Sequence, residues 1–329
     1  MEDHPSWREP NLNTTEVKRQ HYVPQVFLRA FAVNGRIRVC ELADGTEYRT
    51  STANTAVEKY FYNINITDIQ LSVESWLAQL EGKAAPVLEK LRCNPDNILD
   101  LSDEEEVHLA RFITALRFRT PFFRDNSDKM TKSMVQQFKD MAKKQIYHQY
   151  DTKEADAIWS DVIKKPDHWW LKEQEPIQPA TISAHMLGEV QGFANILRAA
   201  PWHLGFAPEP LRLYTSDNPV AGYLSPVRLP GEGAAFSSFT YYVPLSPQIL
   251  LTIKRRPHRK DKEEPKPRGE RLSQEYSQWE ISFARHVVTS DAMKYLYGDS
   301  TIVPRDCAIS CLKRINRAKL EICHPISRI

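Results

Sequence analysis

Glycine is scarce in this chain, and the shortage argues against the common phosphate-binding loops. Only 11 of the 329 residues are glycine. None of them belongs to a Gly-rich loop of the P-loop type or of the dinucleotide-binding type, so we do not expect nucleotide binding by either route. The Gly-x-Ser-x-Gly elbow, the His-Glu-x-x-His helix and the cysteine neighbourhoods of papain-like and caspase-like proteases are missing as well.

Cysteine is also rare. The chain has five cysteines, an odd number spread over a long sequence, which favours reduced, buried thiols over a disulfide framework. Cys307, Cys311, Cys323 and His324 are four potential zinc ligands close together in the sequence. Their spacing matches no common zinc knuckle, and we do not expect a zinc site there.

Long apolar runs are absent. No stretch offers 18 uncharged apolar residues, and the first twenty residues contain no apolar core of a signal peptide, so we expect a cytoplasmic protein without a membrane partner. The charges nearly balance, with 44 basic and 42 acidic side chains and a net charge of +2. Overall charge therefore does not indicate nucleic acid, and any basic surface has to be local.

One segment, residues 254–271, is locally basic. It holds nine basic and four acidic side chains with three prolines and almost no apolar residue. Such a composition predicts a solvated loop between a strand and a helix. An arm that follows a phosphate backbone is the alternative.

What the sequence does contain is a mixture of strand and helix patterns. Alternating residues on both sides of Asp44-Gly45 predict a β-hairpin with a type I′ turn. Ser102 and Glu105 form a capping box before a helix that stops at Thr120-Pro121. The same criteria predict helices at 68–92 (kinked or split in two), about 125–150, 151–163, 179–200 and 271–290, and strands within 202–207, 211–220 and 241–256, with a last short strand near the C-terminal cysteines.

The blocks of helices and strands predict an α+β fold, as a helix-rich single domain with a small, mostly antiparallel sheet. Residues 1–16 are expected to be a flexible or strapped N-terminal arm. Residues 17–329 are expected to form one domain that carries the basic, Pro-rich loop at 254–271. A chain of this length can bury a large core.

The segment RQHYVPQVFLRAF, residues 19–31, sets polar groups among large apolar ones. Pro24 suits the first turn of a helix, which would place His21 just before that helix. Gln25 and Arg29 would then lie one turn apart on its polar side, held rigidly by the apolar side. In the structural alternative, His21 binds a buried carbonyl, Gln25 caps a loop and Arg29 pairs with a carboxylate.

A second candidate lies in ARFITALRFRTP, residues 110–121. Arg111 and Arg117 stand in a very apolar helix, whereas Arg119 is expected to point elsewhere. A guanidinium keeps its charge, so a buried one needs an anion beside it. That anion could be Asp217, an acidic residue of the first helices, or a substrate held by the guanidinium fork.

The third candidate is the end of LRLYTSDNPV, residues 211–220. Ser216, Asp217 and Asn218 follow an apolar strand, in a position where many sites are found. Asp217 could orient His21 or bind a divalent metal, with Ser216 and Asn218 positioning the substrate. The alternative is a turn in which Asp217 accepts main-chain N–H groups.

Five motifs carry a resemblance to a known family. HYVPQVFLRAF, EKYFYN, ARFITALRFRTP, YTSDNPV and YVPLSPQILLTI occur in this order, and together they resemble the domain-of-unknown-function family numbered 4238 over nearly the whole chain. The resemblance implies no activity, because the family has no agreed one.

The three candidate segments lead to one functional hypothesis. If His21, Arg29, Arg117 and Asp217 converge, they form a pocket for a phosphate or carboxylate. In this pocket His21 and Asp217 would be catalytic, and Asp217 would also bind Mg²⁺ or Mn²⁺. The substrate would be bound by Gln25, Arg29, Arg117, Ser216 and Asn218. This set suits a nuclease-like phosphodiester hydrolase acting on nucleic acid or a nucleotide. The alternative is a non-catalytic module that binds a nucleotide or a protein, since the same groups also bind a ground state.

Overall fold

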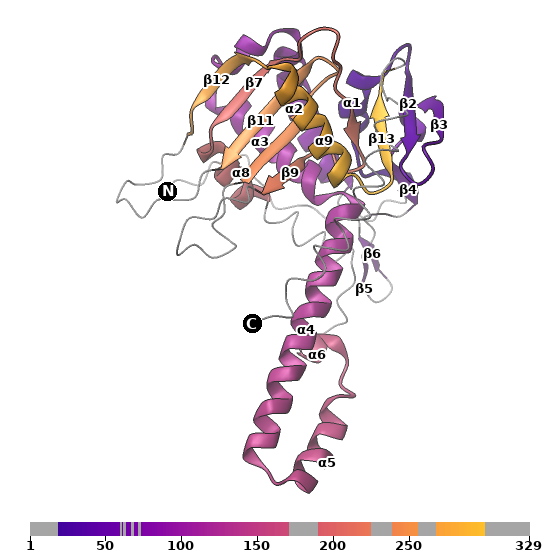
Figure 1. The fold of residues 1–329 in the computed structure, drawn as a ribbon, viewed down its shortest axis with the longest axis vertical. Helices are drawn as coiled ribbons and strands as arrows, with labels where there is room; N and C mark the ends of the chain where they lie inside the picture. Colours follow the sequence, from indigo (N-terminus) through magenta and orange to yellow (C-terminus); the bar gives the residue numbers. More distant parts are fainter. Residues whose placement is uncertain are drawn as a thin grey trace.

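Two sheets, one of five strands and one of four, organise the residues that the computed structural model describes. Those residues are 19–59, 61, 64–66, 69–71, 74–170, 190–224, 239–255 and 268–299. Helices pack against the sheets, and a long helical arm projects from the resulting body (Figure 1). The α+β class with mostly antiparallel strands is confirmed.

The larger sheet has the strand order β12-β7-β11-β10-β9. Its strands are β7 (Trp202–Phe206), β9 (Ala221–Leu224), β10 (Phe239–Pro244), β11 (Ile249–Arg255) and β12 (Arg271–Glu275). All neighbours are antiparallel except β12 and β7, which run parallel.

The smaller sheet joins strands from both ends of the described chain in the order β3-β2-β13-β8. Its strands are β2 (Arg36–Glu41), β3 (Glu47–Ser51), β8 (Thr215–Ser216) and β13 (Tyr295–Gly298). The described residues also form two antiparallel ribbons: β1 (Arg19–His21) with β4 (Val57–Lys59), and β5 (Ile64–Ile66) with β6 (Ile69–Leu71).

Helices lie on both faces of the larger sheet. The α-helices are α1 (Gln25–Leu28), α2 (Glu74–Cys93), α3 (Asp103–Phe118), α4 (Pro121–Gln149), α5 (Thr152–Val162), α6 (Asp167–Trp170), α8 (Val190–Ala199) and α9 (Gln278–Asp291). Short 3-10 helices in the described part of the chain are η1 (Arg29–Phe31), η2 (Thr52–Asn54) and η3 (Pro95–Ile98). None of the described helices is both long and apolar enough to cross a membrane.

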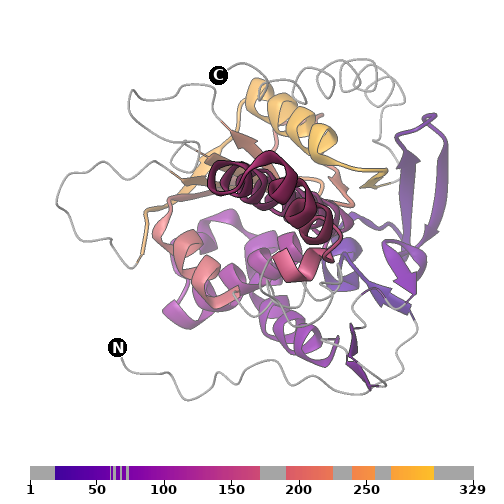
Figure 2. The same ribbon diagram turned by 90° about the horizontal axis from the view of Figure 1, so that it is seen from below.

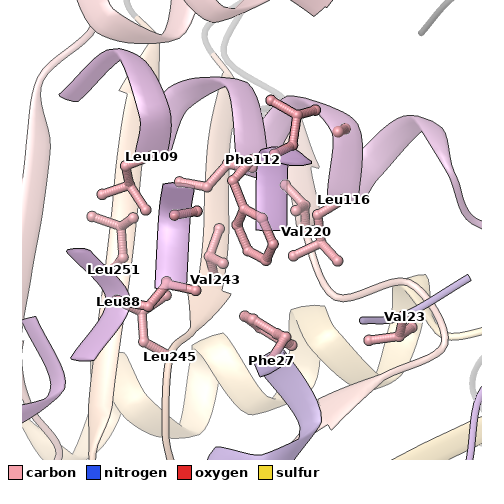
Figure 3. Close-up of a cluster of buried hydrophobic side chains, with 14 of the residues drawn as sticks. Val23, Phe27, Leu88, Leu109, Phe112, Leu116, Val220, Val243, Leu245 and Leu251 are labelled. Carbon is pink, nitrogen blue, oxygen red and sulfur yellow. The ribbon is translucent and has the colours of Figure 1, made fainter. Parts of the chain in front are cut away.

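The main core fills the space between α2, α3 and one face of the larger sheet. Because side chains alternate along a strand, Leu251 and Ile253 of β11 belong to this core, whereas Leu250 packs on the opposite face with Ile281 of α9. Figure 3 shows Phe112 of α3 pointing toward the sheet, with Leu109, Leu116, Val243 and Leu251 among its labelled neighbours. The core therefore holds α3 rigidly against the sheet.

The hairpin predicted around Asp44-Gly45 is confirmed as β2 and β3, but the predicted turn type is wrong. A type I′ turn needs positive φ at both central residues; Gly45 has φ 75° and Asp44 is not among the positive-φ residues. The loop is longer, with Glu41 donating its N–H to the Thr46 carbonyl at 2.9 Å. Two positive φ values in a row occur instead at Asn34 and Gly35, a turn signal that the sequence analysis missed.

The predicted helices are confirmed where capping residues or prolines mark the helix ends in the sequence. The capping box at Ser102 and the end before Pro121 are confirmed in α3, and α4 and α5 match the helices predicted at 125–150 and 151–163. The helix predicted at 68–92 begins later, because residues 69–71 form β6, and it continues through Pro86.

Two further predictions are corrected. The helix predicted at 271–290 begins as strand β12, and only α9 is helical. Cys40 is a buried free thiol as expected, but Cys93 is an exposed one. Residues 256–267 of the basic loop predicted at 254–271, the N-terminal arm predicted at 1–16 and the cysteine-rich segment with Cys307, Cys311 and Cys323 lie outside the described residues.

Candidate functional site

The three candidate segments meet at the C-terminal end of α3. Arg119 donates a hydrogen bond from Nη2 to the main-chain oxygen of His21, at the end of β1. Arg117 donates from Nη1 to the main-chain oxygen of Val220 at 2.7 Å, just after the Thr-Ser-Asp-Asn-Pro segment. Two arginines two positions apart therefore hold the other two segments on either side of the helix end.

Arg119, at the C-terminal cap of this helix, makes a buried ion pair. Its side chain is 2% exposed, and its guanidinium lies 2.6 Å from the carboxylate of Glu81 in α2. An acidic partner from the first helices was predicted for Arg111 and Arg117; the structure has such a pair at Arg119, the arginine expected to point elsewhere. Arg111 donates instead to the amide oxygen of Gln191 in α8.

The opening segment folds much as its proline and its apolar residues predict. Pro24 precedes the short helix α1, and its carbonyl accepts the N–H groups of Phe27 and Leu28 at 3.0 Å. Gln25 is half-buried and Arg29 is exposed. Burial lowers the pKa of His21, a main-chain hydrogen bond with Ala53 opposes the shift, and the nearby charge of Arg119 adds to it.

Asp217 is used as a main-chain acceptor. Its carboxylate accepts the N–H groups of Met293 at 2.8 Å, Lys294 at 2.7 Å and Tyr295 at 3.2 Å, so it fastens the connection between α9 and β13. Burial raises the pKa of Asp217 while these three N–H groups lower it. This geometry favours the structural interpretation of the segment, and its catalytic and metal-binding roles stay predictions.

The neighbours of Asp217 are buried in the same turn. Ser216 Oγ donates to the Asn218 carbonyl at 2.9 Å and accepts the Asn218 N–H at 3.1 Å. The Asn218 amide donates to the main-chain oxygen of Asp291 at 3.2 Å. Within the described ranges, no group of three or more His, Cys, Asp or Glu side chains is arranged to hold a metal ion.

A pocket of about 200 Å³ opens beside Arg117. Its walls come from α3, the first turn of α4, α8 and the sheet, and the lining residues are Ile113, Thr114, Arg117, Phe118, Phe123, Phe193, Ile196, Leu197, Ala200, Val220 and Tyr241. Phe118 stands in the middle of the aromatic wall, 4.7 Å from the Phe123 ring and 4.8 Å from the Phe193 ring between centroids. The pocket is therefore apolar and aromatic with one cationic edge.

Arg117 supplies that edge. Its guanidinium carbon lies 5.0 Å from the centroid of the Tyr241 ring, within the range of a cation–π contact. The charge of Arg117 also acts on Asp291, whose pKa is raised by burial and lowered by the Gly222 N–H and by this guanidinium. The main chain of Val220 and the ring of Tyr241 thus fix the guanidinium in place at the pocket.

The match to known families spans this whole arrangement. A family model described as a protein of unknown function, DUF4238, matches residues 19–298, from the first residue of β1 to the last of β13. The chain belongs to the DUF4238 family. No curated protein and no solved structure matches the chain.

In this DUF4238 protein, Arg117 of the pocket could be identified from the sequence, but the apolar and aromatic residues that line the pocket could not. Phe193 and Leu197 lie in the helix predicted at 179–200 and follow the spacing of a buried helical face, yet Phe193 is 40% exposed and the adjoining Ile196 is 43% exposed. Large apolar residues that face a hollow follow the same helical spacing as residues that face a core. Only the positions of α3, α4 and the sheet separate the two cases.

Proposed function

We propose that this protein is a non-catalytic binding module for a nucleotide-sized organic anion. The flat part of the ligand would lie against Phe118, Phe123 and Phe193, and its phosphate or carboxylate would meet Arg117. The observation that carries the proposal is the guanidinium of Arg117, fixed over Tyr241 at the edge of an aromatic pocket of about 200 Å³.

The chemistry of the pocket supports this class of ligand. Aromatic walls offer stacking to any planar ring, which is worth about 1–3 kcal/mol per base in single-strand binding proteins. A guanidinium binds phosphate or carboxylate through a charge-assisted, often bidentate, pair of hydrogen bonds. Small-molecule sites are typically apolar hollows with few, well-placed polar groups.

The contacts of Asp217 are the reason for preferring binding to hydrolysis. A general base or a metal ligand needs a carboxylate oxygen directed at the substrate or ion, and both oxygens of Asp217 accept main-chain N–H groups. Phosphodiester hydrolysis with His21, Asp217 and Mg²⁺ or Mn²⁺ stays a prediction. Its test is nuclease activity with and without these metals, in the wild type and in Asp217→Ala.

Calorimetric titration with nucleoside monophosphates and with the matching nucleosides tests the proposal. We expect the monophosphates to bind better than the nucleosides. We expect Arg117→Met to weaken monophosphate binding at least about tenfold, because one charge-assisted hydrogen bond is worth about 1.5–3 kcal/mol. Arg49→Met, which removes an exposed arginine from β3, is the matched control and keeps the wild-type affinity.

Phe193→Ala separates the ring contact from the charge contact. It shortens the aromatic wall without changing charge, so both monophosphate and nucleoside should bind more weakly. Equal affinity for monophosphate and nucleoside, or equal affinity in Arg117→Met and the wild type, contradicts the proposal.

A further inference from the structure

Helix α8 supplies one wall of the pocket and is attached to α3 near its N-terminal end. The two helices lie side by side (Figure 1 and Figure 2). Gln191, in the first turn of α8, accepts a hydrogen bond from Arg111 of α3. Helical spacing turns one face of α8 and of the residue that follows it toward the pocket, with Phe193, Ile196, Leu197 and Ala200 among the lining residues.

The C-terminal end of α8 is held by Arg271 of β12. The guanidinium of Arg271 donates from Nη2 to the main-chain oxygen of Arg198 at 2.9 Å and from Nη1 to that of Ala200 at 3.0 Å. The last carbonyls of a helix have no acceptor role inside the helix and need donors from elsewhere. A cation at this end also interacts favourably with the helix dipole. Arg271 therefore caps α8 with its side chain.

The same guanidinium is anchored on α3 and on the larger sheet. It donates to the carboxylate of Glu106 from Nε at 2.8 Å and from Nη2 at 3.2 Å. It also lies over the ring of Trp202 in β7, 4.2 Å from the centroid. With a further bond from Nη1 to the main-chain oxygen of Glu270 at 3.1 Å, each of its five N–H groups has an acceptor. The guanidinium is therefore fixed, and it fixes the end of α8 relative to α3.

Arg268 offers a close comparison with Arg271. It donates from Nε to the same oxygen of Glu106, also at 2.8 Å, and from Nη2 to the main-chain oxygen of Leu101 at 3.4 Å. Neither of these acceptors belongs to α8. The two arginines thus share one buried carboxylate, but the side chain of Arg271 reaches the end of α8 and that of Arg268 binds the residues at the start of α3.

We propose that Arg271 is a positioning residue for the pocket, because it holds α8 at the distance from α3 that a planar ligand needs. The inference deepens the proposed function and rests on it for the class of ligand. Arg117 stands on α3 and is fixed by Val220 and Tyr241, so its contact with the anionic group does not depend on α8. Arg271 therefore acts on the ring contact and leaves the charge contact unchanged.

Calorimetric titration of Arg271→Met with a nucleoside and with its monophosphate is the first test. We expect both ligands to bind about tenfold more weakly, because each must order the loosened wall on binding. The ratio of the two affinities should stay that of the wild type. Arg268→Met is the matched control: it also removes a 2.8 Å partner of Glu106 and should lower the melting temperature to a similar extent, but it should keep both affinities.

Hydrogen exchange without ligand is the second test. The main-chain amides of residues 196–200 should exchange about tenfold faster in Arg271→Met than in Arg268→Met. Equal exchange in the two variants, or equal ligand affinity in the two variants, overturns the role of Arg271. A wild type that binds neither nucleoside nor monophosphate contradicts the proposed function instead. In that case the exchange comparison alone decides whether Arg271 positions α8.

Discussion

Arg119 and Glu81 form an ion pair of 2.6 Å in which the Arg119 side chain is 2% exposed and the Glu81 side chain 25% exposed. The same guanidinium donates to the main-chain oxygen of His21. One side chain therefore links α2, α3 and β1. These elements carry two of the three segments that the sequence singled out.

We expect Glu81→Ala to lower the free energy of unfolding by about 3 kcal/mol, because it leaves a buried guanidinium without its carboxylate. The matched control is Asp161→Ala, which breaks the exposed pair with Lys164 and should cost at most about 1 kcal/mol. Urea denaturation of the two variants measures the difference. Equal losses would mean that the Arg119 pair contributes no more than a surface pair.

Asp217→Asn should destabilise the fold by about 3 kcal/mol or more. An amide nitrogen would then face a main-chain N–H, and hydrogen bonds to a charged acceptor are worth about 1.5–3 kcal/mol each. Asp100→Asn, at an exposed carboxylate, is the control and should leave the melting temperature unchanged. If the Asp217→Asn variant instead has the melting temperature of the wild type and lacks a metal-dependent nuclease activity that the wild type shows, the result supports a catalytic role of Asp217 and contradicts the structural interpretation.

Acidification should destabilise the protein through two histidines. Burial lowers the pKa of His21 and of His108 below 6.5, with positive charges of Arg119 and Lys83 adding to the respective shifts. Below about pH 6.5 the unfolded chain therefore binds more protons than the folded one, and the free energy of unfolding falls as the pH falls toward the folded-state pKa values.

The measurement is urea denaturation at several pH values between about 7.5 and 5. The double variant His21→Gln/His108→Gln should lose less stability over this interval than the wild type. Each imidazole contributes a slope of at most about 1.4 kcal/mol per pH unit. If the free energy of unfolding fell equally with pH in both proteins, the pH dependence would not come from His21 and His108.

Gly205 and Gly82 should respond to alanine in opposite directions. A Cβ at Gly205 in β7 would lie 1.7 Å from the main-chain oxygen of Gln274, its partner in β12, so Gly205→Ala should cost about 3 kcal/mol, at the upper end of overpacking penalties. A Cβ at Gly82 meets nothing within 4 Å. Gly82→Ala should stabilise α2 by up to about 1 kcal/mol, and thermal denaturation of both variants shows whether the signs differ.

The fold could be predicted from the sequence where nearby residues mark both ends of an element. Ser102, Glu105 and Pro121 mark both ends of α3 within a few residues of the helix itself, and the structure has the helix there. The position of the turn after β2 was predicted correctly, but its type was not. Only Gly45 has a positive φ, whereas a type I′ turn needs a positive φ at both central residues.

Contacts between distant segments could not be predicted in this way. Glu106 stands in an acidic first turn, which indicates a solvated position, yet it is 0% exposed and pairs with Arg268 and Arg271 at 2.8 Å. Asp217 was matched with His21, but its hydrogen-bond donors are residues 293–295. In both cases the partner comes from the far end of the chain, where neither periodicity nor capping carries information.

Because β2 is hydrogen-bonded to β3 on one side and to β13 on the other, the smaller sheet cannot close until β13 has been synthesised. The β2–β3 hairpin leaves the ribosome long before β13, and until then the edge of β2 that pairs with β13 stays open. An open strand edge invites pairing with other chains. Nascent chains that stop short of β13 should therefore be the species most prone to aggregate.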